Sequence, residues 1–188
     1  MTAPPIRSHG LDLVSMSSLF VSALLGGERD EAEQLLGARL PEDWPDDHDA
    51  RFLRLRLEQM RDDPEVEEWL VRAVVLRPDA RVVGHAGFHG PPGVNALEKP
   101  GFIEIGYTVF APFRGRGYAT EAALALMGWA GARGGVEGFV ASVAPENEPS
   151  LAIVRKLGFV PVGERWDQED GLELVWELRG APPLRAPL

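Results

Sequence analysis

One octapeptide governs the interpretation of this chain: Arg114-Gly115-Arg116-Gly117-Tyr118-Ala119-Thr120-Glu121. An apolar strand pattern, Phe102 to Phe110, precedes it, and a helix-forming run, Glu121 to Ala130, follows it. A glycine-rich turn from a strand into a helix leaves backbone N–H groups unpaired, and the helix dipole adds partial positive charge there. Arginine is well shaped to clamp phosphate oxygens, and two arginines stand in the turn. The sequence therefore predicts a phosphate-bearing ligand at this helix start.

Other phosphate-binding patterns fit this segment poorly. A dinucleotide fingerprint reads G-x-G-x-x-G with an acid about 20 residues on. Here Gly115-x-Gly117 is followed by Thr120, and no acid ends a following strand at that distance. The Gly-Lys-Ser/Thr of a P-loop is absent. The match is to [QR]-x-x-G-x-[GA], filled by Arg114, Gly117 and Ala119, which resembles the acyl-CoA pyrophosphate loop of the GNAT N-acetyltransferase superfamily. A nucleotide-dependent oxidoreductase is the rival interpretation.

A second motif strengthens the resemblance. Asn147-x-x-Ser150 followed by Arg155-Lys156-Leu157-Gly158-Phe159 is similar to the family's N-x-x-[AS]…K-x-G-F, and it follows the first motif in the family's order. Glu104-Ile105-Gly106-Tyr107, together with residues 117–122, resembles the RimJ/RimL-like branch. The resemblance covers roughly residues 82–177. It implies a single α/β domain over residues 1–188, with a GNAT-like mixed, largely antiparallel central sheet flanked by helices on both faces, and loose ends at 1–10 and 180–188.

The same resemblance implies an enzyme that moves an acetyl group from acetyl-CoA to a primary amine by direct attack in a ternary complex. The acceptor is left open between a protein N-terminus and a small-molecule amine, and family habit makes a homodimer plausible. Loops Pro41–Asp49 and Gly90–Gly101 are expected to decide the acceptor. A non-catalytic acyl-CoA-binding or sensing module is the alternative.

The resemblance also assigns residues to the cosubstrate. The segment Val109 to Ala111 would pair with the pantetheine amides as an added strand, and the N–H of Val109 would hold the thioester oxyanion. The predicted acetyl-CoA-binding residues are Val109, Phe110, Ala111, Arg114, Gly115, Arg116, Gly117, Tyr118, Ala119, Thr120, Asn147 and Lys156. For Lys156, a solvated helix end that complements the dipole is an equal alternative.

Three residues are predicted to carry the chemistry. Glu104 lies ten positions before Arg114 among apolar neighbours, and a positioned carboxylate can take the amine proton directly or through water; a structural carboxylate is the alternative. Many relatives place the thiolate's acid, a Tyr, seven positions after the motif's Asn147, but here that position is Val154. Ser150 is the substitute candidate, with helix capping as its alternative role. Asn147 is expected to order the loop and bond pantetheine or water.

Composition narrows the remaining possibilities. The chain has 188 residues and no cysteine, so a cysteine nucleophile, a disulfide or a thiolate metal site is excluded. Its net charge is −10, so nucleic acid is not an expected partner. The acidic field suits cationic amines by steering, or simply serves solubility. No run is long enough to span a bilayer, and a cytoplasmic location without membrane binding is expected. His85 and His89 would lie roughly 13 Å apart on a strand, too far to share an ion, so no metal is predicted.

Apolar spacing predicts the N-terminal elements. Helices are expected from Ser17 or Ser18 to Leu25, from Arg29 to Leu36 with Leu35 and Leu36 inward, and over residues 50–60. In the third helix, Arg51, Arg54, Arg56 and Arg61 are expected on the outer side. Later elements are a hairpin of Glu68–Leu76 and Arg81–Phe88, a strand Gly138–Val143, a helix Ser150–Leu157, and a hairpin of Phe159–Glu164 and Leu172–Leu178. Trp44, Trp166 and Trp176 are expected to pack, with acceptor-pocket roles as the alternative.

Overall fold

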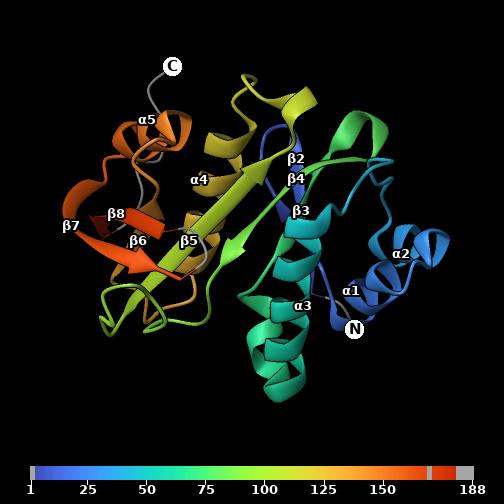
Figure 1. Ribbon diagram of the computed structural model, residues 1–188, viewed down its shortest axis with the longest axis horizontal. Helices are drawn as coiled ribbons and strands as arrows, with labels where there is room; N and C mark the ends of the chain where they lie inside the picture. The colour runs from blue at the N-terminus through green and yellow to red at the C-terminus, as the bar shows by residue number, and fades with distance from the viewer. Residues whose placement is uncertain (1–2, 169–170, 181–188) are drawn as a thin grey trace.

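A computed structural model describes residues 3–168 and 171–180 (Figure 1). Its strands form one eight-stranded sheet in the order β1-β2-β3-β4-β5-β6-β8-β7. The strands are β1 Ile6–Arg7, β2 Leu11–Ser15, β3 Arg72–Leu76, β4 Arg81–Phe88, β5 Phe102–Val109, β6 Gly138–Val143, β7 Val160–Asp167 and β8 Gly171–Arg179. The α-helices are α1 Ser18–Leu25, α2 Arg29–Leu36, α3 Asp47–Asp62, α4 Tyr118–Gly131 and α5 Glu148–Lys156, and the 3-10 helices are η1 Pro64–Glu68, η2 Arg77–Asp79 and η3 Ala111–Phe113.

Neighbouring strands of this sheet pair antiparallel, except β5 and β6, which pair parallel, within the residues described. Helices cover both faces, with α3 in front of the sheet and α4 behind it in Figure 1. The expected mixed, largely antiparallel α/β fold is therefore confirmed. Among the same residues, no helix has both the length and the apolarity that a membrane span requires.

Each face of the sheet has its own core. On one face, α4 and α5 bury residues such as Leu126 and Val154 against Ile103 of β5. On the other face, α1, α2 and α3 pack on the N-terminal strands, with Leu53 among the fully buried side chains. Over β5, β6 and β8 this second face has no helix in its core cluster; the loop between β4 and β5 covers Phe102 there. The β4–β5 loop, rather than a helix, therefore covers this face of the sheet at β5, β6 and β8.

Local signals place most helix ends. Ser17 caps α1 by accepting from the Phe20 N–H at 3.3 Å, and Gly37 ends α2 in the left-handed conformation at φ 71°. The third helix begins three residues earlier than predicted because Asp46 caps it, accepting from the Asp49 N–H at 2.8 Å. Side-chain oxygens satisfy N–H groups that the helix itself leaves unpaired, so these ends follow from the nearby sequence.

The expectation of a loose segment over residues 1–10 is wrong for residues 6–10, while residues 1–2 lie outside the described part. Residues Ile6–Arg7 form β1 on the edge of the sheet, and the Glu121 carboxylate of α4 accepts from the Ser8 hydroxyl and the Gly10 N–H, each at 2.7 Å. Both partners lie more than a hundred residues away in sequence, so no local pattern announces them. The tail after Gly180 lies outside the described residues.

Three smaller expectations also need correction. The β3 strand begins at Arg72 rather than Glu68, because Pro64–Glu68 forms η1. In α2, Leu36 is buried but Leu35 is 41% exposed, since the short helix meets the core along one narrow stripe. Trp166 is 77% exposed on the outermost strand, β7, and so does not pack as expected.

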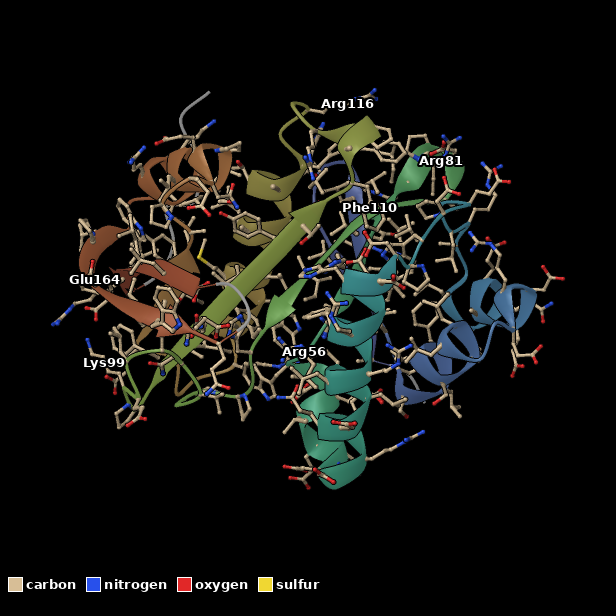
Figure 2. All side chains as sticks on the ribbon, in the orientation of Figure 1. Arg56, Arg81, Lys99, Phe110, Arg116 and Glu164 are labelled. Carbon is tan, nitrogen blue, oxygen red and sulfur yellow. The ribbon has the colours of Figure 1, made fainter. Side chains whose placement is uncertain are left out.

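Arg56 of α3 is the correction that bears on function. It was expected on the outer side of the helix but is only 7% exposed. It stands three and four positions from Leu53 and Met60, and next to Leu57, so it belongs to the apolar stripe that faces the sheet. Figure 2 shows Arg56 on the side of α3 that faces the central strands.

Candidate active site

The central feature of the site is a gap between the parallel strands β5 and β6. Their pairing stops at Glu104, while β5 continues to Val109 beside β4. The Phe110 N–H donates to the Val83 carbonyl at 2.9 Å. Because backbone groups alternate along a strand, those of Tyr107 and Val109 face away from β4, toward the gap. The β5 edge is therefore open to an extended ligand that supplies the missing strand pairing.

A cleft of about 420 Å³ occupies this gap and reaches both faces of the sheet. Side chains from α3 and β4 line it on one side, and the start of α5 lines it on the other. The lining residues used below are Asp49, Phe52, Arg56, His85, His89, Gly106, Tyr107, Ser142, Asn147 and Ser150. A volume of this size is in the range of small-ligand sites.

The predicted phosphate loop lies at the start of α4. Gly115 and Gly117 adopt positive φ values of 75° and 82°, and Gly117 caps α4 without any side-chain hydrogen bond to the first turn. An added Cβ at either glycine would meet nothing within 4 Å, so backbone conformation rather than crowding requires glycine there. The free N–H groups of the first turn and the dipole form the expected anion site.

The arginines of this loop are held differently. The Arg114 Nε donates to the Val109 carbonyl at 2.9 Å, which fixes the loop against the end of β5. Arg116 is exposed, with one long contact of 3.5 Å from Nη2 to the Pro112 carbonyl, and Figure 2 shows it at the outer tip of the loop. Arg116 is thus free to turn toward a phosphate.

Glu104 is buried beneath the β4–β5 loop, with a side-chain exposure of 1%. Its Oε2 accepts from the Ala96 N–H and its Oε1 accepts from the Ser142 hydroxyl, both at 2.6 Å. The Oε1 also lies 3.7 Å from the His89 Nδ1 and 3.9 Å from the Arg165 Nη2. A carboxylate so enclosed is not among the residues that line the cleft.

His89 stands between Glu104 and the cleft. Its side chain is 37% exposed, and its Nε2 lies 3.5 Å from where a Cβ on Gly106 would stand. Burial lowers the pKa of His89; Glu104 opposes this, while Arg56 and Arg165 reinforce it. The ring is therefore neutral near pH 7, with one nitrogen toward Glu104 and the other over the β5 strand.

The start of α5 forms the other wall. Asn147 caps this helix by accepting from the Ser150 N–H at 3.2 Å, so its predicted ordering role is supported. The buried Tyr107 hydroxyl lies near Ser150 without a hydrogen bond of ordinary geometry. Burial raises the pKa of Tyr107 to about 12, and Ser150 opposes the rise. Val154 is 1% exposed in the core, so the usual Tyr position is apolar packing here.

The wall formed by α3 and β4 carries a second polar cluster. The His85 Nε2 lies 3.2 Å from the Asp49 Oδ1, and the Phe52 ring stacks on His85 with centroids 5.1 Å apart. The Arg56 guanidinium lies 4.8 Å from the Phe52 centroid. Burial alone would raise the pKa of Asp49, but its hydrogen bond and charge interaction with His85 lower it. This wall therefore consists of ionisable and aromatic side chains that contact one another, and it is not a solvent-exposed helix face.

The predicted residues separate into two groups. Asn147 and Ser150 line the cleft, and Glu104 is not among its lining residues. Val109 ends β5, and the phosphate loop follows it at the start of α4. Phe110 has its N–H bound to Val83 and Ala111 begins η3, so the open edge runs back to Tyr107 rather than forward to Ala111. Lys156 lies at the exposed end of α5, where it complements the helix dipole.

Sequence reasoning missed Arg56, Tyr107 and Ser142 as parts of the site. For Arg56 a signal existed, because it shares the spacing of Leu53 and Met60. Tyr107 is three positions from Glu104, so alternation directs the two to opposite faces of β5. The packing expected of Trp44 and Trp176 is confirmed, since both are buried and neither lines this cleft.

Comparison with known proteins identifies the family. Residues 28–160 match the model described as an acetyltransferase (GNAT) domain, and the chain therefore belongs to the GNAT family. It is 34% identical over 94 residues to YjdG, an uncharacterized N-acetyltransferase of Bacillus subtilis, covering 50% of this chain; the chain spans about half the length of that relative (51%).

Solved structures share the fold. An acetyltransferase from Agrobacterium tumefaciens superposes with a TM-score of 0.61 at 23% identity, covering 96% of each chain. The ribosomal L7/L12 alpha-N-protein acetyltransferase RimL, in complex with coenzyme A, superposes with a TM-score of 0.62 at 18% identity, covering 93% of this chain and 97% of RimL. The predicted resemblance to RimJ/RimL-like GNAT proteins is thus confirmed at the level of family and fold.

Proposed function

We propose that the protein is an acetyl-CoA-dependent N-acetyltransferase that acts on a primary amine by direct attack. The observation that carries this proposal is the open β5 edge, with a glycine-rich anion site at one end and a buried carboxylate on the far side of the gap. The coenzyme A in the RimL complex supports coenzyme A as the occupant. The pantetheine of coenzyme A would pair with the Tyr107–Val109 edge, while the phosphates of coenzyme A meet the N–H groups of residues 115–120.

Acetyl transfer would then take place in the gap between β5 and β6. The amine nitrogen attacks the thioester carbonyl carbon, the new C–N bond forms, and the C–S bond breaks. The Val109 N–H, which faces the gap, would stabilise the oxyanion, and a preorganised donor of this kind is a large catalytic contribution. Ser150 would protonate the departing thiolate, with the protonated Tyr107 hydroxyl beside it as a second donor.

Glu104 would remove the amine proton indirectly. Because its carboxylate is enclosed, the proton would pass to the neutral His89 ring, which reaches the cleft, while Glu104 orients the ring and stabilises its charged form. This arrangement follows the general logic of a base held by a buried carboxylate. The acidic surface and net charge of −10 favour approach of cationic amines.

The test has two readouts. Thermal denaturation with acetyl-CoA, CoA, NAD and ATP should show stabilisation by the two CoA species, about 2.7 kcal/mol at a hundred times the dissociation constant. The double variant Arg116→Glu/Gly117→Glu should lose it. Release of free CoA thiol in the presence of amines should then demonstrate transfer. Binding without any transfer would favour the alternative, a non-catalytic acyl-CoA sensor, and no response to CoA would refute both.

A further inference from the structure

The cleft contains a buried cation, Arg56, that makes no ion pair within the described part of the chain. Arg56 is 7% exposed and lines the cleft. Its Nη1 donates to the Gln59 Oε1 at 2.9 Å and, at 3.3 Å, to the His89 carbonyl. Its Nε is buried without a hydrogen-bond partner, and neither Nη2 nor any other nitrogen of Arg56 makes an ion pair with a carboxylate of the described residues. Part of the guanidinium is therefore unsatisfied.

Such a group is costly to keep. A buried charge without a partner is strongly unfavourable, and burial lowers the pKa of Arg56 to about 10, although the charge of Glu104 opposes this. At that pKa the guanidinium remains charged near neutral pH. Contact with the Phe52 ring offsets only part of the desolvation. A partly unsatisfied guanidinium on the wall of a ligand cleft indicates that an anionic group of the ligand supplies its missing hydrogen bonds and counter-charge.

The cosubstrate's phosphates do not explain this cation. They are assigned to the loop at the start of α4, and Figure 2 shows Arg116 of that loop well apart from Arg56, which lies on α3. The remaining partner of the cleft is the acceptor. The anionic group that Arg56 would bind therefore belongs to the same acceptor molecule that carries the amine.

The spacing indicates how close the acceptor's charges are. His89 contacts both sides: its carbonyl accepts from Arg56, and its ring nitrogen lies 3.7 Å from the Glu104 carboxylate. The same residue, His89, therefore contacts the anion site at Arg56 with its carbonyl and supplies the proton-accepting ring. In a free amino acid, the amine and the carboxylate share one carbon. In a protein N-terminus, a neutral amide replaces that carboxylate and offers no charge to Arg56.

We propose that the acceptor is a free amino acid, whose carboxylate binds Arg56 while its amine lies at His89. This inference rests on the proposed acetyl transfer and names its substrate class. The Arg56 Nη2, which neither Gln59 nor the His89 carbonyl uses, would hold the carboxylate by charge-assisted hydrogen bonds. Arg56 would act as a specificity-determining residue and take no part in proton transfer.

The experiment compares each free amino acid with its amide, which has the same side chain and amine but no carboxylate. CoA release is measured at equal concentrations of unprotonated amine, since amidation lowers the amine pKa. We expect at least one amino acid to exceed its amide in kcat/KM by roughly 10- to 100-fold, the effect of charge-assisted hydrogen bonds. In Arg56→Gln this ratio should fall to about 1, mainly through KM, and Arg56→Lys should recover part of it.

Arg54→Gln, an exposed arginine of the same helix, is the matched control and should keep the wild-type ratio. Unchanged stabilisation of Arg56→Gln by acetyl-CoA shows that the variant is folded and its cosubstrate site intact. Equal use of acids and amides by the wild type, or an equal loss of both in Arg56→Gln, would overturn the inference. So would Arg56-dependent transfer confined to peptides with an acidic side chain. Absence of any acetyl-CoA effect on the wild type is a different failure, that of the proposed function itself.

Discussion

Replacing Glu104 by Gln separates catalytic from structural roles of the buried carboxylate. Gln has nearly the same shape, and its amide can still accept from the Ala96 N–H while its NH₂ donates to the Ser142 hydroxyl, which can rotate to accept. What is lost is the negative charge beside His89 and Arg165. His89, the proposed proton acceptor, would then lose the carboxylate that stabilises its charged form. We expect the transfer rate, kcat, to fall by about 10²-fold or more, the usual contribution of general acid–base catalysis.

The effect on stability should be distinct from that on activity. Glu104→Ala leaves the Ala96 N–H and the Ser142 hydroxyl without their acceptor and removes the charge beside Arg165. Removing one partner of a buried polar cluster lowers the free energy of unfolding by about 3–5 kcal/mol. At roughly 2–4 °C per kcal/mol for a chain of this size, the melting temperature should fall by about 6–20 °C. Glu104→Gln should lose much less, because both hydrogen bonds can be kept.

The assays are thermal denaturation, acetyl-CoA binding and CoA release. Glu177→Gln is the matched control, since Glu177 is a buried carboxylate on β8, which is separated from β5 by β6. It is bound at 2.6 Å by Lys99 and at 2.7 Å by Arg179. It should lose stability with kcat within about twofold of the wild type. If Glu104→Gln binds acetyl-CoA normally and keeps kcat within threefold of the wild type, Glu104 is a structural carboxylate and the proposed proton path is wrong.

Three further predictions concern the loop, a tyrosine and an ion pair. Gly117→Ala should cost about 1–2 kcal/mol because an L-residue is forced to positive φ, yet keep the thermal shift by acetyl-CoA, whereas Gly117→Glu should lose that shift; equal behaviour of the two would contradict the anion site. In Tyr118→Phe, which leaves Tyr107 as the single tyrosine, absorbance at 295 nm should titrate with a midpoint of about 12, with circular dichroism confirming that the chain is folded; a midpoint near 10 would show that Tyr107 is not buried. The hydrogen bond from Lys99 lowers the pKa of Glu177 below its usual 4.5, so the stability it contributes is present above pH 4.5 and is lost as the pH falls through the lower, folded-state pKa. Denaturant titrations should therefore show a weaker acid dependence in Glu177→Gln than in the wild type, and identical slopes would refute the pairing.

Local chemistry made several parts of this protein predictable. The positive φ values at Gly115 and Gly117, the Asn147 cap of α5 and the end of α2 at Gly37 depend on a residue and its near neighbours. These features carry the phosphate loop, the second motif and most helix boundaries. The family and the mixed sheet followed because two such motifs stand in order along the chain.

The remaining features depend on contacts between distant segments. The pairing of the N-terminal segment with Glu121 of α4, the enclosure of Glu104 by the β4–β5 loop and the position of His89 each join residues that no local pattern relates. Arg56 is the clearest case, because its periodicity places it in the apolar stripe while its charge suggests the surface. Packing of α3 against β4 settles that conflict in favour of burial. The guanidinium contacts Gln59 and Phe52 of its own helix, but the His89 carbonyl comes within its reach only in the folded chain.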